Sequence, residues 1–174
     1  MDIYLVRHTT PAIEKGICYG QTDLDLALSF DLEADKILQK LPQYIDAVYC
    51  SPLDRCLQLA KKISPNPQQD NRLKELNFGD WEMQPWDNIP LQEIQPWYDD
   101  FVNTPTLNGE SYKILYNRAI DFYKHLLQQN YQTAILVTHS GVIRSILSYL
   151  KNTPLKDSFD EFKIGYGEVL KVEA

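Results

Sequence analysis

Residues 134–150 read AILVTHSGVIRSILSYL and carry the clearest structural signal in the chain. The run at 134–138 is short, apolar and partly β-branched, which is typical of a strand buried on both faces. Residues 141–150 then place apolar side chains at helical spacing, and the pattern stops before Pro154. A strand that leads into a helix is the repeating unit of a parallel sheet covered by helices.

The same unit recurs earlier in the chain. Apolar runs at 2–6 and 47–50 are predicted to be further strands. Helices are predicted after Ser29, from Ser51-Pro52 with Ser51 as N-cap and Pro52 at the first position, and over 111–129. The alternating tail at 163–173 is predicted to be an edge strand. We therefore expect an α/β fold with three α/β/α layers and a mainly parallel sheet.

Residues 78–107 break this alternation. They are dense in tryptophan, tyrosine and phenylalanine, and prolines interrupt them. We expect this stretch to be a small cap insertion folded on the sheet, within one domain that spans residues 1–174. Aromatic residues at this density more often pack against one another than form a platform for a ligand.

Composition narrows the class of partner. The formal net charge is −7, with 44% hydrophobic and 24% charged residues. A chain this acidic is not expected to bind nucleic acid or anionic membranes, which require a basic surface. No secretory signal or bilayer-spanning run is present, and Cys18, Cys50 and Cys56 are too few and too irregular for a disulfide framework or zinc site. Cys50 and Cys56 are predicted to be core residues, and the cytoplasm is the expected location.

Four potentially positive side chains follow the predicted strands. Arg7 and His8 end the first strand, Arg55 lies in the first turn of the helix after the second, and His139 ends the strand at 134–138. In an open parallel sheet, ligands bind at the carboxyl ends of the strands. These groups would repel one another without an anion, and a phosphate fits best because guanidinium groups bind its oxygens bidentately.

The chemistry that such a cluster can perform is phosphoryl transfer. A neutral imidazole can attack phosphorus, and a second, cationic imidazole can stabilise the charge on the equatorial oxygens. No GxxxxGKS/T or GxGxxG stretch, HExxH motif or acidic metal-binding triad stands out, so no nucleotide, other cofactor or metal ion is expected. The leaving oxygen needs a proton, for which Glu75, Asp80 and Glu82 are candidates that spacing alone does not separate.

Five blocks of sequence resemble the histidine phosphatase superfamily, which includes phosphoglycerate mutases, sugar bisphosphatases and small phosphatases. They occur in the family's order along nearly the whole chain: LVRHTTP at 5–11, SPLDRCLQLA at 51–60, LKELNFGDWE at 73–82, NGES at 108–111 and LVTHSGVIR at 136–144. The resemblance implies a phosphoglycerate mutase-like fold and a metal-independent phosphomonoester hydrolase that acts through a phosphohistidine intermediate. The expected partner is a small-molecule phosphomonoester.

Roles for single residues follow from the resemblance. It implies His8 as the nucleophile beside Arg7, Arg55 as the arginine that grips the phosphate, and His139 as the second histidine. It favours Glu75 over Asp80 and Glu82 as proton donor. Backbone amides of Ser140 and Gly141 would complete the phosphate cradle, and Gly20 and Gln21 would lie at the pocket mouth.

The sequence departs from the family pattern after the first histidine, where RHTTP replaces the usual RHG followed by Glu or Gln. Thr9 or Thr10 could contact phosphate there through a hydroxyl. The stretches CYGQTD and FGDWE look like the α-ribazole phosphatase branch, which removes the 5′-phosphate of α-ribazole phosphate during cobalamin assembly. A short stretch between Glu75 and Gly109 agrees, because a mutase needs a longer insertion to exclude water.

Several alternatives stay open. The chain could be a broad-specificity phosphatase, a mutase, an enzyme acting on protein phosphohistidine, or a phosphate-binding module without activity. The last needs neither a nucleophile nor an acid, which argues against it. Arg118 and Arg144 are interpreted as solvated helix charges, Glu82 as a helix-start or surface carboxylate, and His125 as a structural or surface residue.

Overall fold

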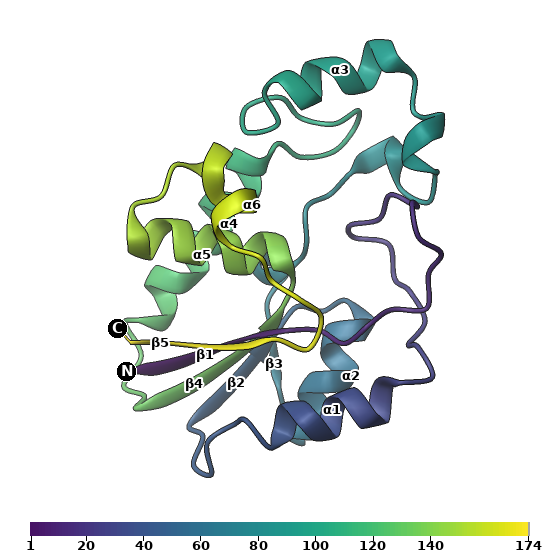
Figure 1. Ribbon diagram of the computed structural model, residues 1–174. Coiled ribbons are helices and arrows are strands. Elements are labelled where there is room, and N and C mark those ends of the chain that lie inside the picture. The colour runs from purple at the N-terminus through teal and green to yellow at the C-terminus, as the bar shows by residue number, and fades with distance from the viewer. Residues whose placement is uncertain (174) are drawn as a thin grey trace.

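The computed structural model describes residues 1–173 and has the expected three-layer α/β/α architecture (Figure 1). One five-stranded sheet has the order β3-β2-β4-β1-β5. Four of its strands are parallel: β1 (Asp2–Arg7), β2 (Ala47–Cys50), β3 (Gln68–Gln69) and β4 (Thr133–Thr138). The fifth, β5 (Val169–Glu173), runs antiparallel to β1 at the edge of the sheet.

Helices cover both faces of the sheet (Figure 1). α4 (Tyr112–Leu126) and α5 (Ser140–Lys151) lie on one face, and α1 (Phe30–Leu38) and α2 (Asp54–Ile63) lie on the other. Shorter elements are η1 (Asn71–Leu73), which follows β3, and η4 (Leu155–Asp157) and α6 (Ser158–Glu161), which follow α5.

The alternation of side chains along β4 explains why this strand has to be apolar throughout. Ala134 and Leu136 pack in the core under α4 and α5, and Ile135 and Val137 pack in the core under α1 and α2. All four are fully buried, and burial of each larger side chain contributes about 1.5–3 kcal/mol. A strand between two helical layers has no solvent face, which accounts for the uninterrupted run in the sequence.

Strand register brings the ends of distant segments together. Arg7 at the end of β1 pairs with Thr138 of β4, and Cys50 at the end of β2 pairs with Val137. The next residues along each strand, His8, Ser51 and His139, therefore lie side by side at the carboxyl edge of the sheet.

Three local predictions are corrected by the structure. α2 begins at Asp54 with Leu53 as its N-cap, so Ser51 does not cap it; the Ser51 hydroxyl instead bonds the His139 ring. The strand predicted at 163–173 is extended only from Val169, because the chain first turns at Gly167 (φ 66°). The two-residue strand β3 was not predicted, since its exposed glutamines lack any apolar pattern.

Residues 78–107 contain η2 (Gly79–Trp81), η3 (Trp86–Asn88) and α3 (Leu91–Asp99), which lies farthest from the sheet at the top of Figure 1. Their buried side chains form a separate apolar cluster with Cys18, which comes from the loop after β1. Trp86 and Trp97 stack within it, with ring centroids 5.9 Å apart. We refer to residues 78–107 as the cap segment.

Cys18, Cys50 and Cys56 are free and fully buried, as predicted for the last two. Within residues 1–173, no helix combines the length and apolar character that a bilayer crossing requires.

Candidate active site

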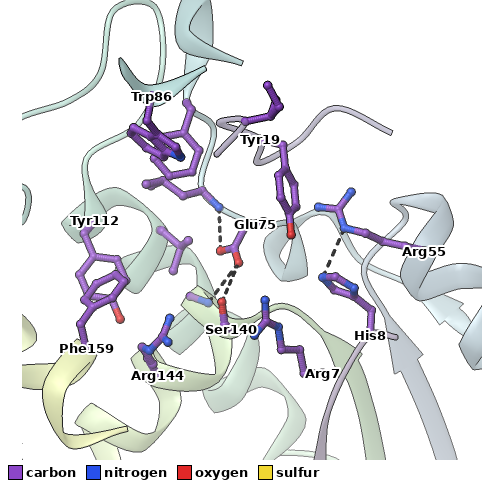
Figure 2. A pocket seen from close by; sticks show the side chains of 15 residues that line it. Arg7, His8, Tyr19, Arg55, Glu75, Trp86, Tyr112, Ser140, Arg144 and Phe159 are labelled. Carbon is purple, nitrogen blue, oxygen red and sulfur yellow. Dashed lines mark hydrogen bonds between the residues drawn. The ribbon is translucent and has the colours of Figure 1, made fainter. Parts of the chain in front are cut away.

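A cavity of about 210 Å³ opens at the carboxyl edge of the sheet (Figure 2). Four of the five residues predicted to act on phosphate line it, namely Arg7, His8, Arg55 and Glu75. Its other walls come from the loop after β1, the cap segment and helices α4 to α6: Ile17, Tyr19, Leu76, Phe78, Trp86, Tyr112, Leu115, Ser140, Gly141, Arg144 and Phe159. The cavity therefore has a cationic floor and a largely aromatic outer wall.

The hydrogen bonds of His8 fix its tautomer. Nδ1 lies 2.7 Å from the carbonyl oxygen of Thr9, and Nε2 lies 3.4 Å from Nε of Arg55. A carbonyl only accepts and a guanidinium only donates, so the proton is on Nδ1 and the lone pair is on Nε2. The nitrogen that faces Arg55 is thus the one that can attack phosphorus.

His139 lies beside His8 but is held differently. The two rings meet edge to face with centroids 5.0 Å apart. His139 is fully buried, its Nε2 is 2.8 Å from the Ser51 hydroxyl, and the same nitrogen is 3.4 Å from the Cys56 sulfur.

Both imidazoles are neutral at pH 7 in this arrangement. Burial lowers the pKa of His8, and the positive charge of Arg55 lowers it further. Burial and then Arg55 likewise lower the pKa of His139. The cationic second imidazole expected from sequence thus requires a phosphate dianion beside it, which would offset the two arginines.

Arg55 is fully buried and rigidly placed. Its Nη2 donates to the Gly20 carbonyl at 2.6 Å and its Nη1 to the Thr22 carbonyl at 2.9 Å. These two carbonyls orient the guanidinium so that Nε points at His8 (Figure 2).

Arg7 is positioned by the segment that precedes β5. Its Nη1 donates to the Ile164 carbonyl at 2.6 Å, and its guanidinium lies 3.8 Å from the centre of the Tyr166 ring. The backbone of the same segment is tied to the end of β1, because Gly167 N donates to His8 O and Arg7 N donates to Glu168 O. The Arg7 Nε is buried without a partner within residues 1–173, which leaves a donor for an anion.

Two tyrosines cover the arginines. Tyr166 lies over Arg7, and the Tyr19 ring centre is 5.6 Å from the Arg55 guanidinium. Their hydroxyl groups are hydrogen-bonded to each other, so the two rings are tied together above the arginines.

Glu75 reaches the start of α5 (Figure 2). Its Oε2 accepts from Gly141 N at 3.2 Å and from the Ser140 hydroxyl at 3.4 Å, and its Oε1 accepts from Leu76 N at 2.9 Å. The Gly141 amide, expected to bind phosphate, therefore donates to Glu75 here. A side chain at position 141 would meet Glu75 Oε1 at 2.3 Å, so only glycine allows this approach.

The other two acid candidates do not line the cavity. Asp80 accepts from the Asn108 amide on the surface. Glu82 is not the helix-start or surface carboxylate interpreted from sequence, because its carboxylate accepts backbone N–H groups of the loop at 20–22. Gly20 and Gln21 also lie off the cavity wall, behind Arg55, so the expectation that they contact substrate at the mouth does not fit this geometry.

Sequence reasoning misassigned two arginines. Arg144 lines the cavity, with its Nε donating to the Phe162 carbonyl and its guanidinium 4.6 Å from the Phe159 ring centre. Its spacing of four residues from Ser140 on a helix was an available signal, since such residues share a face. Arg118 is largely buried, pairs with the Glu110 carboxylate and donates to the Glu75 carbonyl. The contact with Glu75 joins segments far apart in the chain, so no local sequence pattern indicates it.

Residues 1–173 contain no cluster of three or more His, Cys, Asp or Glu side chains that could share a metal ion.

Comparison with known proteins gives concordant matches. A family model described as the histidine phosphatase superfamily (branch 1) matches residues 3–174. The putative phosphoserine phosphatase 2 of Hydrogenobacter thermophilus is 28% identical over 164 residues, covering 89% of this chain and 81% of that protein. The adenosylcobalamin/alpha-ribazole phosphatase of Escherichia coli K12 is 26% identical over 178 residues, covering 96% and 87%.

Solved structures agree on the fold. The crystal structure of the alpha-ribazole phosphatase from Shigella flexneri superposes with a TM-score of 0.90 at 24% identity, covering 99% of this chain and 90% of that one. A phosphoglycerate mutase structure from Thermus thermophilus superposes with a TM-score of 0.76 at 25% identity, covering 99% and 93%.

Proposed function

The chain belongs to branch 1 of the histidine phosphatase superfamily and is a phosphatase, and from this premise we propose that it hydrolyses a small phosphomonoester through a phosphohistidine on His8. The observation that carries the proposal is the His8 tautomer. Its unprotonated Nε2 faces the cavity floor beside Arg55, while its Nδ1 proton is held by a backbone carbonyl. A nucleophile in this state needs no separate base to activate it.

In the first step, the Nε2 lone pair of His8 forms a bond to phosphorus. The bond from phosphorus to the leaving oxygen breaks, the oxygen keeps its electron pair, and protonated Glu75 donates a proton to release the alcohol. Arg7, Arg55 and His139 surround the transferred group and stabilise the charge on its oxygens.

In the second step, a water molecule attacks the phosphohistidine. Ionised Glu75 takes one proton from that water, and the phosphorus–nitrogen bond breaks with its electron pair returning to His8 Nε2. The products are the alcohol and inorganic phosphate, and both His8 and Glu75 return to their starting states.

We propose α-ribazole 5′-phosphate as the physiological substrate. We propose the cytoplasm as the location of the enzyme. The ring-rich outer wall, with Phe78, Trp86 and Phe159, suits an aromatic leaving group. The CYGQTD and FGDWE stretches and the name of the Escherichia coli relative support the same substrate. Three free, buried cysteines fit a reducing compartment.

A second candidate is a phosphomonoester whose leaving group carries a carboxylate. Arg144 favours it, because this arginine lines the cavity and only its Nε is hydrogen-bonded within residues 1–173. The relative in Hydrogenobacter thermophilus carries a phosphoserine phosphatase name, which supports this alternative.

The proposal is tested by inorganic phosphate release in the presence of a chelator. The substrates are α-ribazole 5′-phosphate, phosphoserine, 3-phosphoglycerate and an aryl phosphate. His8→Ala should lower kcat at least about a thousandfold, as expected on losing a covalent nucleophile. His125→Ala, which removes the exposed histidine of α4, is the matched control and should leave kcat unchanged.

Enzyme quenched during turnover without acid should carry a phosphoryl group on His8, which mass spectrometry can locate. Activity of His8→Ala within tenfold of wild type would exclude the covalent route. Isomerised product instead of free phosphate would assign a mutase.

A further inference from the structure

The carboxylate of Glu82 is saturated with hydrogen bonds from the neighbouring loops. Its Oε1 accepts from Gln21 N at 2.8 Å and Phe78 N at 3.1 Å. Its Oε2 accepts from Thr22 N at 2.6 Å and from the Thr22 hydroxyl. Three backbone amides and one hydroxyl on a single carboxylate form a charge-assisted clamp, which is stronger than neutral hydrogen bonds of the same number.

The loop held by this clamp is the one that orients Arg55. The carbonyls of Gly20 and Thr22, on either side of the amides bound by Glu82, accept from the two Nη atoms of Arg55. The third donor of Arg55, its Nε, points at Nε2 of His8. A continuous chain of contacts thus runs from Glu82 through the loop at 20–22 to the attacking nitrogen.

Packing leaves this loop little freedom. A Cβ at Gly20 would lie 1.9 Å from the Leu76 carbonyl oxygen and 3.0 Å from Glu82 Oε1, so the backbone there is pressed against the segment that carries both glutamates. The Gln21 side chain also donates to the Glu75 carbonyl at 3.0 Å. The loop is therefore held in one conformation, and the Glu82 carboxylate is the charged group that holds it.

We propose that Glu82 is a positioning residue for phosphoryl transfer, which sets the orientation of Arg55 through the carbonyls of Gly20 and Thr22. The inference rests on the proposed function for the roles of Arg55 and His8. It assigns Glu82 no contact with substrate, since its side chain does not line the cavity and both of its oxygens are occupied. Proton donation stays with Glu75.

The test compares Glu82→Gln with wild type in two measurements: the affinity for inorganic phosphate by titration calorimetry, and kcat with a good and a poor leaving group. A glutamine offers one acceptor oxygen and no charge, so the loop at 20–22 and the Arg55 guanidinium are no longer held in a fixed orientation. We expect phosphate affinity and kcat each to fall about 10- to 100-fold, the scale of a small misplacement of a binding group. The loss in kcat should be equal for both leaving groups, because Arg55 acts on the transferred phosphoryl group.

Asp46→Asn is the matched control. The Asp46 carboxylate also accepts two backbone amides, Gln132 N and Thr133 N at 2.8 Å each, but at the opposite end of the sheet. Loss of that clamp should leave phosphate affinity and kcat unchanged, even if it lowers the melting temperature.

A double-mutant cycle with Arg55→Lys separates positioning from a general loss of structure. A lysine lacks the planar guanidinium whose two Nη atoms bind the Gly20 and Thr22 carbonyls in a fixed orientation, so Glu82→Gln should cost much less in the Arg55→Lys background than in wild type. Equal losses in both backgrounds would overturn the proposal. So would a folded Glu82→Gln variant whose phosphate affinity and kcat stay within twofold of wild type.

If Glu82→Gln does not fold, Thr22→Val provides the second variant, because it removes only the hydroxyl that donates to Glu82. A severalfold loss in phosphate affinity supports the proposal, and no loss overturns it. Calorimetry measures phosphate binding independently of hydrolysis. If wild type binds phosphate more tightly than Glu82→Gln but hydrolyses none of the substrates, the proposed function is refuted and the positioning role of Glu82 stands.

Discussion

At the scale of single residues, the site places two neutral imidazoles against two arginines in a desolvated space. His8 faces Arg55, Arg7, the His139 ring and the Tyr166 ring. Burial and the neighbouring positive charge both oppose protonation of either histidine. The proposed nucleophile is thereby kept unprotonated, and the positive charge of the two arginines favours an anion in the cavity.

The same arrangement makes folding stability depend on pH. An unfolded histidine titrates near 6.5, whereas the folded pKa values of His8 and His139 lie below that. As pH falls through about 6.5, the unfolded chain binds protons that the folded chain does not, so stability is full above this pH and declines below it. In buffer without phosphate, the free energy of unfolding should fall between pH 7 and 5.5 by at most about 1.4 kcal/mol per pH unit for each histidine.

Urea unfolding at several pH values measures this slope. His139→Gln should make it shallower, because it removes one of the two buried imidazoles. A slope that is the same in His139→Gln and wild type would contradict the assignment of His139 as buried and neutral.

At the scale of elements, α4 fastens the loop that carries Glu75. Arg118 of α4 donates to the carbonyls of Arg72, Lys74 and Glu75, and pairs with the Glu110 carboxylate at 2.8 Å. The two charged side chains are each only 17% exposed, so the pair is largely desolvated. A helix on one face of the sheet thereby determines where the proposed proton donor lies.

Arg118→Met should lower the free energy of unfolding by about 2–4 kcal/mol, because it removes the charged partner of a largely buried carboxylate and a donor to three carbonyls. It should also reduce kcat most for poor leaving groups, which depend on Glu75. Denaturant unfolding and a leaving-group series check the two effects. The double variant Arg118→Met/Glu110→Gln should recover part of the stability, and a single-variant loss below 1 kcal/mol would argue against this role.

At the scale of the whole molecule, the cap segment adds an aromatic wall to a cavity whose floor belongs to the sheet. Trp86 lines the cavity and is stacked on Trp97 of α3. Under the proposed function, the floor binds the part of the substrate common to all phosphomonoesters, and the wall faces the part that differs among them. Substrate recognition and phosphoryl transfer would then belong to different segments.

Trp97→Ala should therefore raise KM for a ring-bearing phosphomonoester severalfold while leaving inorganic phosphate affinity unchanged, since Trp86 would lose the ring that supports it. Steady-state kinetics and calorimetry measure the two quantities. Trp97→Phe keeps an aromatic ring and should behave like wild type. An equal loss of phosphate affinity in Trp97→Ala would show that the cap segment also shapes the floor.

The sequence was sufficient for the parts of the fold that have a periodic signal. The apolar run at 134–138 and the helical pattern at 111–129 predict β4 and α4 because their causes are local. Ser51 was misassigned because α2 begins only at Asp54. Its hydroxyl accepts from Leu53 N just before the helix and also bonds the His139 ring, 88 positions away, which the sequence does not reveal.

Some residues of the candidate site could also be predicted from local sequence, and others could not. Arg7, His8, Arg55, Glu75 and His139 stand next to predicted strand ends or in recognisable blocks, so their convergence could be predicted. Glu82, Arg118 and Arg144 act through contacts between loops and helices far apart in the chain, and a charged residue carries no local mark of its partner.

The segment before β5 holds Arg7 by contacts that reach 157 positions along the chain, and it also binds the backbone at His8. Without this segment, Arg7 loses its hydrogen bond to the Ile164 carbonyl and β1 loses the strand that pairs with its outer edge. Phosphate binding through Arg7 should therefore depend on residues 164–168 being docked beside β1, so a chain in which this segment is detached should be inert toward phosphate esters.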